Sequence, residues 1–191
     1  MLNKGYLSSN KTAAGDEAYT PFYAVTPVLK YLKMRGYQTV WCPFDEEWSA
    51  YVRLLREHKF TVIRSSLSDG KDFFKYEPSE PYDIIISNPP FSKKNEVLQR
   101  VDTLCKPFAL LLPMNSLQGA KRFDVFERGI QLLSFDQRIG FHNPQMMQTP
   151  VEGNSFSSAY FCRDFLPKDL IVERLHKYSR PLIDGGKNSY G

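Results

Sequence analysis

The chain has 191 residues, which is enough for one domain with a sizeable core but hardly for two. Hydrophobic residues make up 42% and charged residues 24%, a composition typical of soluble globular proteins rather than of disordered or membrane proteins. The net charge of +4 is compatible with a nucleic-acid partner, but the basic residues form only short pairs, Lys93-Lys94 and Lys121-Arg122. A mildly basic, solvated surface explains these pairs equally well.

The three cysteines, Cys42, Cys105 and Cys162, are far apart and odd in number, so they predict neither a disulfide framework nor a zinc site. Cys42 and Cys162 lie in apolar runs, where buried thiols are usual. No apolar run approaches the roughly 18 residues that a membrane helix needs. We therefore expect a cytoplasmic protein with no metal site and no membrane span.

The predicted elements begin after an N-terminal arm, residues 1–15, which is rich in Ser, Asn, Lys and Gly. Thr26 and Pro27 predict the start of a helix, with Thr26 as its N-cap, and Gly36 predicts its end. Apolar periodicity then predicts, in order, a strand at 38–42, a helix over 48–55, strands at 60–64 and 82–86, a helix over 97–104, a strand at 108–112, a helix over 117–126, strands at 130–135 and 155–161, and a helix over 168–176.

Strands and helices alternate through most of the chain, which requires crossover connections and a mostly parallel sheet. We therefore predict an α/β, Rossmann-like fold in a single domain, residues 16–191. The strands at 130–135 and 155–161 have no clear helix between them, which indicates an antiparallel strand at the C-terminal edge of the sheet. Ligands of such sheets bind outside the carboxyl ends of the strands.

The turn Asn88-Pro89-Pro90-Phe91 follows directly on the apolar strand at 82–86. Its two prolines fix two φ angles and remove two N–H donors, so the turn is stiff and rich in acceptors. The Asn88 side-chain oxygen and the Pro89 carbonyl can accept both hydrogens of one amino or amide group, while Phe91 stacks on a flat substrate. Such acceptors stabilise the positive charge that develops when the nitrogen receives a methyl group. The alternative is a rigid loop that merely ends a strand.

The run SNPPF, residues 87–91, resembles the catalytic motif (D/N/S)PP(Y/F/W) of S-adenosylmethionine-dependent N6-adenine DNA methyltransferases. The chain is similar, over most of residues 19–162, to small adenine methyltransferase-like proteins carried by phages and mobile elements. The resemblance implies a class I methyltransferase fold, S-adenosyl-L-methionine as cofactor, adenine in DNA as methyl acceptor, and four catalytic residues: Asn88, Pro89, Pro90 and Phe91. Relatives that methylate an RNA base or a protein glutamine leave those acceptors open.

Three further segments resemble cofactor-binding motifs of the family. In AYTPFYAV, residues 18–25, the Thr-Pro pair would lie near the methionine part of the cofactor. In GKDFF, residues 70–74, Asp72 would bind the adenine amino group of the cofactor and Phe73 would line its ring. The loop after the first strand would complete the site. The implied cofactor-binding residues are Tyr19, Thr20, Pro21, Cys42, Pro43, Phe44, Asp45, Asp72 and Phe73.

The chain departs from the family pattern at two points. The loop at 41–51 contains no glycine, and its Asp45 can either receive the ammonium group of the cofactor or cap the following helix. After the second strand, where the family places an acidic residue for the ribose, the chain has Arg64-Ser65-Ser66, and a serine or the nearby Asp69 can replace it. A methyltransferase fold that has lost catalysis and binds nucleic acid or protein is therefore the alternative function.

The sequence contains no evident domain for target recognition, so the segment at 138–154 is the candidate for this role. Its polar side chains can contact phosphates or base edges: Arg138, His142, Gln145 and Gln148. Met146 and Met147 can insert into a base stack. The alternative is a long surface loop whose methionines pack on the core.

Overall fold

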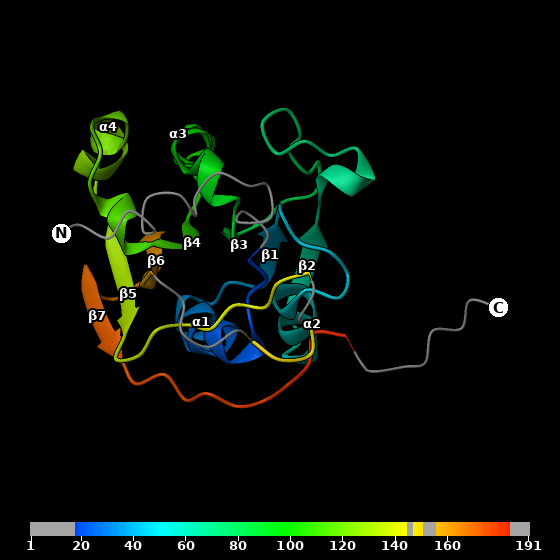
Figure 1. Ribbon diagram of the computed structural model, residues 1–191. Helices are drawn as coiled ribbons and strands as arrows, with labels where there is room; N and C mark the ends of the chain where they lie inside the picture. Colours follow the sequence, from blue (N-terminus) through cyan, green and yellow to red (C-terminus); the bar gives the residue numbers. More distant parts are fainter. Residues whose placement is uncertain (1–17, 145–146, 151–155, 184–191) are drawn as a thin grey trace.

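The computed structural model describes residues 18–144, 147–150 and 156–183, so the predicted arm at 1–15 lies outside it. A seven-stranded sheet has the order β2-β1-β3-β4-β6-β5-β7 (Figure 1). Its strands are β1 (Thr39–Cys42), β2 (Thr61–Arg64), β3 (Ile84–Ser87), β4 (Phe108–Pro113), β5 (Gln131–Phe135), β6 (Ser158–Arg163) and β7 (Leu170–Glu173). The helices of the described residues are α1 (Phe22–Arg35), α2 (Ala50–Glu57), α3 (Lys94–Leu104) and α4 (Phe123–Glu127). Single 3₁₀ turns lie in the connections: η3 (Leu67–Asp69), η4 (Phe91–Lys93), η5 (Met114–Leu117) and η6 (Ala120–Arg122).

The pairing of the strands confirms the predicted α/β, Rossmann-like class with a mostly parallel sheet. Every strand points the same way except β6, which is antiparallel to both β4 and β5. The predicted position of this strand is wrong, because the edge strand is β7, which is parallel to β5. Ala159, Tyr160 and Phe161 of β6 are all 0% exposed, as suits a strand that is paired on both edges and covered on both faces.

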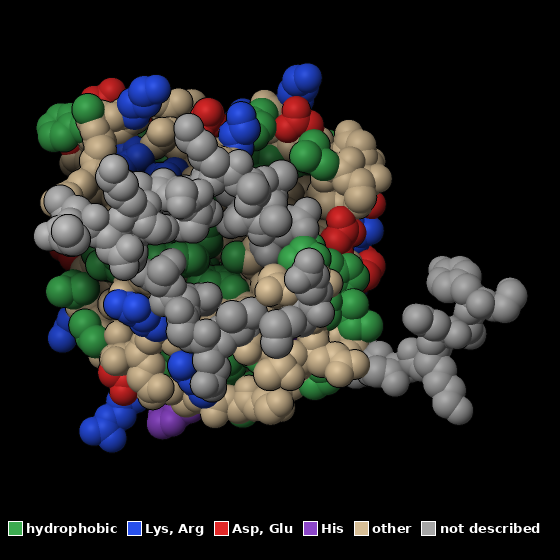
Figure 2. Space-filling view, in the orientation of Figure 1, with side chains coloured by type: hydrophobic (Ala, Val, Ile, Leu, Met, Phe, Trp, Pro, Cys, Tyr) green, Lys and Arg blue, Asp and Glu red, His purple; other side chains and the backbone are tan. Residues whose placement is uncertain are grey.

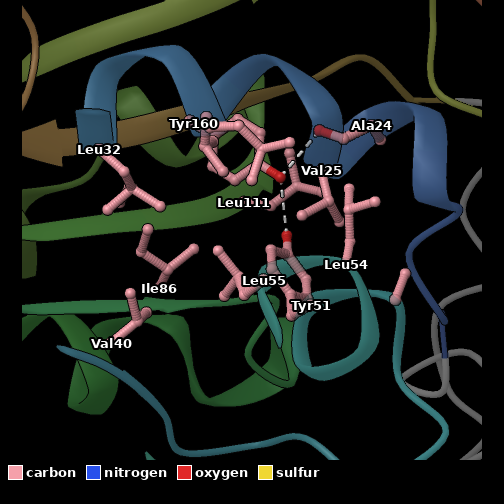
Figure 3. Close-up of a cluster of buried hydrophobic side chains, with 14 of the residues drawn as sticks. Ala24, Val25, Leu32, Val40, Tyr51, Leu54, Leu55, Ile86, Leu111 and Tyr160 are labelled. Carbon is pink, nitrogen blue, oxygen red and sulfur yellow. Dashed lines mark hydrogen bonds between the residues drawn. The ribbon is translucent and has the colours of Figure 1, made fainter. Parts of the chain in front are cut away.

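Helices cover both faces of the sheet, α1 and α2 on one side and α3 and α4 on the other (Figure 1). On the α1 and α2 side, a chain of hydroxyl groups crosses the core (Figure 3). Tyr160 Oη donates to the carbonyl of Ala24 at 2.9 Å, and Tyr51 Oη lies 2.9 Å from Tyr160 Oη. Because Tyr160 uses its only hydrogen on Ala24, Tyr51 must be the donor in the second bond. These bonds tie α2, β6 and α1 together beneath the carboxyl ends of the strands.

Helix α1 begins five residues earlier than predicted. Its N-cap is Pro21, not Thr26, and Pro27 lies inside the helix. The residues of the first turn, 22–25, are all buried, so their packing outweighs the backbone hydrogen bond that Pro27 cannot make. Thr26 instead donates its hydroxyl to the carbonyl of Phe22 at 3.1 Å. The predicted end is confirmed, because Gly36 adopts the left-handed conformation that closes many helices.

Two other predicted helices fail in the C-terminal half. Of the helix predicted over 117–126, only α4 (Phe123–Glu127) forms. The preceding residues form 3₁₀ turns, which Gly119 and the side chain of Arg122 organise. The segment at 168–176 forms strand β7 rather than a helix, since its Ile171 and Val172 pair with Leu133 and Ser134 of β5. Adjacent β-branched residues favour a strand, and tertiary pairing decided the outcome.

Candidate functional site

The strand order reverses between β1 and β3, because β2 lies on the far side of β1 and all later strands lie beyond β3. Ligands of open α/β sheets bind at such points, outside the carboxyl ends of the strands. A pocket of about 240 Å³ opens there. Its wall combines the loop after β1, the turn after β3 and the segment before α1, and includes Thr20, Phe44, Asp45, Asn88 and Pro90.

Asp45 is the buried acid of the pocket, with 6% of its surface exposed. Ser87, the last residue of β3, donates its hydroxyl to Asp45 Oδ2 at 2.5 Å. Burial raises the pKa of Asp45 to about 7, although the hydrogen bonds from Ser87 and Ser49 act to lower it, and Glu46 adds a small upward push. The carboxylate therefore changes its charge close to neutral pH.

The two roles left open for Asp45 are separated by its position. The N-cap residue of α2 is Ser49, whose hydroxyl accepts a hydrogen bond from the backbone N–H of Glu46 at 2.9 Å. Asp45 lies four residues before this cap, and its carboxylate accepts a hydrogen bond from Ser87 of β3. The helix-capping alternative is therefore wrong, and a buried carboxylate in a pocket is available to a positively charged ligand.

Asn88 directly follows the carboxyl end of β3, and a hydrogen bond fixes the orientation of its side-chain amide. Its Nδ2 donates to the carbonyl of Ala18 at 2.5 Å, so the amide oxygen Oδ1 is directed away from that contact. Oδ1 is buried and has no hydrogen-bond partner among the described residues. An acceptor in this state costs stability unless a ligand or a water molecule in the pocket supplies a donor. Pro89 is buried beside it, and Pro90 lines the pocket.

Phe91 does not line the pocket, although it belongs to the same turn. Its ring lies edge-to-face against Phe156 at 5.5 Å and against Phe141 at 6.1 Å between centroids. Phe141 and Phe156 stack on each other at 5.8 Å. This aromatic cluster, residues 91, 141 and 156, fixes the ring of Phe91, which remains partly exposed. The predicted stacking of Phe91 on a substrate therefore stays a prediction.

The segment before α1 lines the pocket and forms an isolated antiparallel β-bridge with the segment that contains His142. The backbone of Tyr19 exchanges two hydrogen bonds of 2.8 Å with His142, and the Tyr19 ring lies edge-to-face on Trp48 at 4.8 Å. Thr20 is 5% exposed and lines the pocket, as does Tyr19. Pro21 is placed as the N-cap of α1 and is not part of the pocket wall.

The remaining predicted cofactor residues lie behind the pocket. Cys42 is fully buried in the core, burial raises the pKa of its thiol, and Pro43 is buried as well. Phe44 lines the pocket and contacts Phe73 at 4.8 Å between ring centroids. Phe73 is 2% exposed, and Asp72 Oδ1 accepts the backbone N–H of Phe74 at 3.0 Å. Phe44 thus connects Phe73 of the predicted adenine-binding pair to the pocket.

A network of charged side chains lies at the end of β2, where the resemblance implies an acidic residue for the ribose. Arg64 contacts Asp69 at 2.6 Å, Glu47 at 2.7 Å and Glu46 at 3.6 Å. Ser65 is fully buried and accepts the indole N–H of Trp41 at 2.9 Å. Asp69, Ser65 and Glu46 all have partners, and of these three residues Glu46 lines the pocket.

Several residues of the pocket were not predicted from the sequence. Glu46, Trp48, Ser49 and Tyr51 follow Asp45 within the same loop and helix, so proximity to a recognised motif could have indicated them. The same holds for Ser87, which directly precedes Asn88 and binds the pocket residue Asp45. No sequence signal marks Leu182, which reaches the pocket from the C-terminal segment. Its backbone carbonyl accepts a hydrogen bond of 2.7 Å from Arg53 of α2.

The segment at 138–154 is only partly available for recognition. His142 is 0% exposed and cannot meet a macromolecule, whereas Arg138 and Gln148 are exposed. Met147 packs against the core on the α1 and α2 side, as the surface-loop alternative predicted. Gln145 and Met146 lie outside the described residues.

Comparisons with known proteins find no match for this chain, either among protein-family models or among curated proteins. Within residues 18–144, 147–150 and 156–183, no helix is long and apolar enough to cross a membrane. The same residues contain no cluster of three or more His, Cys, Asp or Glu side chains suited to a metal ion. The pocket geometry is therefore the main guide to function.

Proposed function

We propose that the protein is an S-adenosylmethionine-dependent methyltransferase that acts on the N6 amino group of adenine in DNA. The observation that carries the proposal is Asn88 Oδ1, a buried acceptor without a partner among the described residues, in a pocket that also holds the buried acid Asp45. The Asn88 oxygen can accept a hydrogen bond from the amino group of a substrate, and the Asp45 carboxylate can pair with the ammonium group of the cofactor. Their shared pocket lies at the strand-order reversal, where α/β sheets bind ligands.

The residues present fit the cofactor. Ionised Asp45 would hold its ammonium group, and Thr20 would lie along its methionine part. Of the carboxylates that contact Arg64, Glu46 lines the pocket, so it rather than Asp69 would accept the ribose hydroxyls. Phe44, backed by Phe73, would contact the adenine ring, with Asp72 at its amino edge. When bound, the cofactor supplies an electrophilic methyl group.

Asn88 performs the central step in this proposal. Its Oδ1 accepts one hydrogen of the substrate amino group, and the Pro89 carbonyl accepts the other. Both acceptors stabilise the positive charge that develops on the nitrogen during transfer, and the proton is released afterwards without a strong general base. The hydrogen bond from Asn88 Nδ2 to Ala18 holds Oδ1 in place, so no reorganisation is needed when the substrate binds.

Asn88 would orient any flat amino or amide group in this way, so the same chemistry on an RNA base or a protein glutamine is the nearest alternative. The second alternative is a fold that no longer binds the cofactor and acts as a binding module. Arg64 favours it, because a cation held by three carboxylates stands where the family has its ribose acid. Cofactor binding separates these cases.

Calorimetric titration with S-adenosylmethionine tests the proposal. We expect binding by the wild-type protein at pH 8 and a loss of at least about tenfold in Asp45→Asn, because charge-assisted hydrogen bonds contribute on the order of 1.5–3 kcal/mol. Glu46→Gln should also weaken binding, whereas Asp69→Asn is the matched control and should leave affinity unchanged. Folded protein that shows no binding would contradict the proposal and favour the binding module.

A further inference from the structure

The two basic pairs that are separate in the sequence meet in the fold. Arg122 Nη1 donates to Asn95 Oδ1, which joins η6 to the beginning of α3. Lys93 ends η4 directly before α3, and Lys121 precedes Arg122 in η6. Both lysine side chains are exposed. Figure 2 shows Lys and Arg side chains, with Asp and Glu between them, at the end of the molecule where α3 and α4 lie.

Arg122 makes the loop after β4 rigid. The side chain is buried at 6% exposure, its Nε donates to the Ser116 carbonyl at 2.6 Å, and its Nη2 donates to the Gln118 carbonyl. Gly119 packs directly on the guanidinium group, since a Cβ there would lie 2.6 Å from Arg122 Cζ. A buried arginine saturated by carbonyls fixes the residues around it rather than binding a ligand.

The rigid loop presents apolar side chains to solvent. Leu117 is 41% exposed, and Phe123, which follows Arg122, is 63% exposed. An exposed aromatic ring next to exposed lysines is the combination that binds single-stranded nucleic acid, with the ring stacking on a base and the lysines contacting phosphates. Lys121 and Phe123 are only two residues apart, which matches this arrangement.

The surface adjoins the aromatic cluster of Phe91. The backbone N–H of Met114, at the start of the loop, donates to the carbonyl of Ser157 at 2.8 Å, and the neighbouring Phe156 contacts Phe91. On the other side, Lys93 follows Phe91 by two residues. The start of the loop and Lys93 are therefore each linked to the turn that also carries Asn88.

We propose that Lys93, Lys121, Leu117 and Phe123 form a contact surface for the nucleic-acid strand that carries the target base. The inference rests on the proposed function. Glu96 and Asp124 are also exposed on α3 and α4, so the surface contacts only one or two phosphates. Phe123 stacks on a base flanking the target, which suits a substrate that is single-stranded or locally opened.

Fluorescence anisotropy with a labelled single-stranded DNA 20-mer tests this surface. Lys93→Gln/Lys121→Gln should lower affinity and make the slope of log affinity against log salt shallower by about 1.4, since each phosphate contact on single strands contributes about 0.7. Phe123→Ala should weaken binding by roughly fivefold or more, because stacking contributes on the order of 1–3 kcal/mol per base. The control Lys33→Gln/Lys168→Gln removes two exposed lysines elsewhere and should match the wild type.

Titration with S-adenosylmethionine on the same variants separates this inference from the proposed function. Intact cofactor binding with weakened DNA binding supports the surface. Wild-type protein that binds the cofactor but not DNA overturns the surface while leaving the proposed chemistry in place. Equal weakening in the control pair overturns it too, because the lysines would then act only through net charge.

Discussion

Replacing Asp45 with asparagine should stabilise the ligand-free protein at alkaline pH. Burial raises the pKa of Asp45 from its ordinary value of 3.8 to about 7. Between these values the folded protein holds a proton that the unfolded chain has released, so this residue makes the fold less stable as pH rises through the window. Above pH 7 the whole penalty is present, and it corresponds to about 4 kcal/mol. Asparagine carries no charge and avoids it.

Not all of this energy is recovered in the variant. The asparagine oxygen can still accept from Ser87, but its NH₂ group needs an acceptor, and a buried donor left without one costs about 1–3 kcal/mol. The net gain at pH 8 is therefore on the order of 2 kcal/mol. For a chain of this size that raises the unfolding midpoint temperature by roughly 4–8 °C. At pH 5.5 only about 2 kcal/mol of the penalty is present, and the cost of the unpaired NH₂ group offsets it, so the variant should have about the stability of the wild type.

Thermal unfolding followed by circular dichroism at pH 8 and pH 5.5 measures both numbers. Asp169→Asn, at an exposed position at the start of β7, is the control and should change the midpoint little at either pH. If Asp45→Asn is destabilising at pH 8, or shifts the midpoint equally at both values, the carboxylate is not buried at an energetic cost and the reasoning about the pocket fails.

Three other predictions follow from the same contacts. Because only ionised Asp45 attracts an ammonium group, affinity for S-adenosylmethionine should fall by about tenfold per pH unit below pH 7, a dependence that calorimetry should find absent in Asp45→Asn. Tyr160→Phe should lower the free energy of unfolding measured in urea by about 1–3 kcal/mol, because the Tyr51 hydroxyl loses its buried acceptor. Tyr51→Phe leaves the hydrogen bond from Tyr160 to Ala24 intact and should lower it by only about 1 kcal/mol (Figure 3). Leu182→Ala should weaken cofactor binding without moving the pH profile; unchanged affinity would remove the C-terminal segment from the site.

Sequence patterns predicted the first half of the fold well because local and tertiary preferences agree there. Strands β3 and β4 carry apolar runs that suit burial on both faces, and every strand up to β4 lies within two residues of its expected start. The C-terminal half failed where tertiary contacts decide. Residues 168–176 have a helix-like apolar spacing, but pairing with β5 makes part of them a strand. Pro27 misled the prediction of α1 because burial of residues 22–25 outweighs its cost.

The candidate site was predicted where a motif and the topology coincide. Asn88 and Asp45 follow β3 and β1, whose carboxyl ends must be adjacent at the strand-order reversal, so their meeting was foreseeable. The fixed ring of Phe91 was not, because Phe141 and Phe156 reach it from a distant segment. The hydrogen bond between Asn88 and Ala18 likewise joins positions 70 residues apart, which no single-sequence pattern reveals.

Mass spectrometry of nucleosides after incubation with S-adenosylmethionine and adenine-rich DNA shows whether the protein methylates N6 of adenine. We expect N6-methyldeoxyadenosine with the wild-type protein and none with Asn88→Ala, which should still bind the cofactor because Asp45 and Glu46 are untouched. Parallel reactions with RNA and with glutamine-containing protein identify a different acceptor. Cofactor binding without methyl transfer to any of the three, or full activity in Asn88→Ala, would contradict the account.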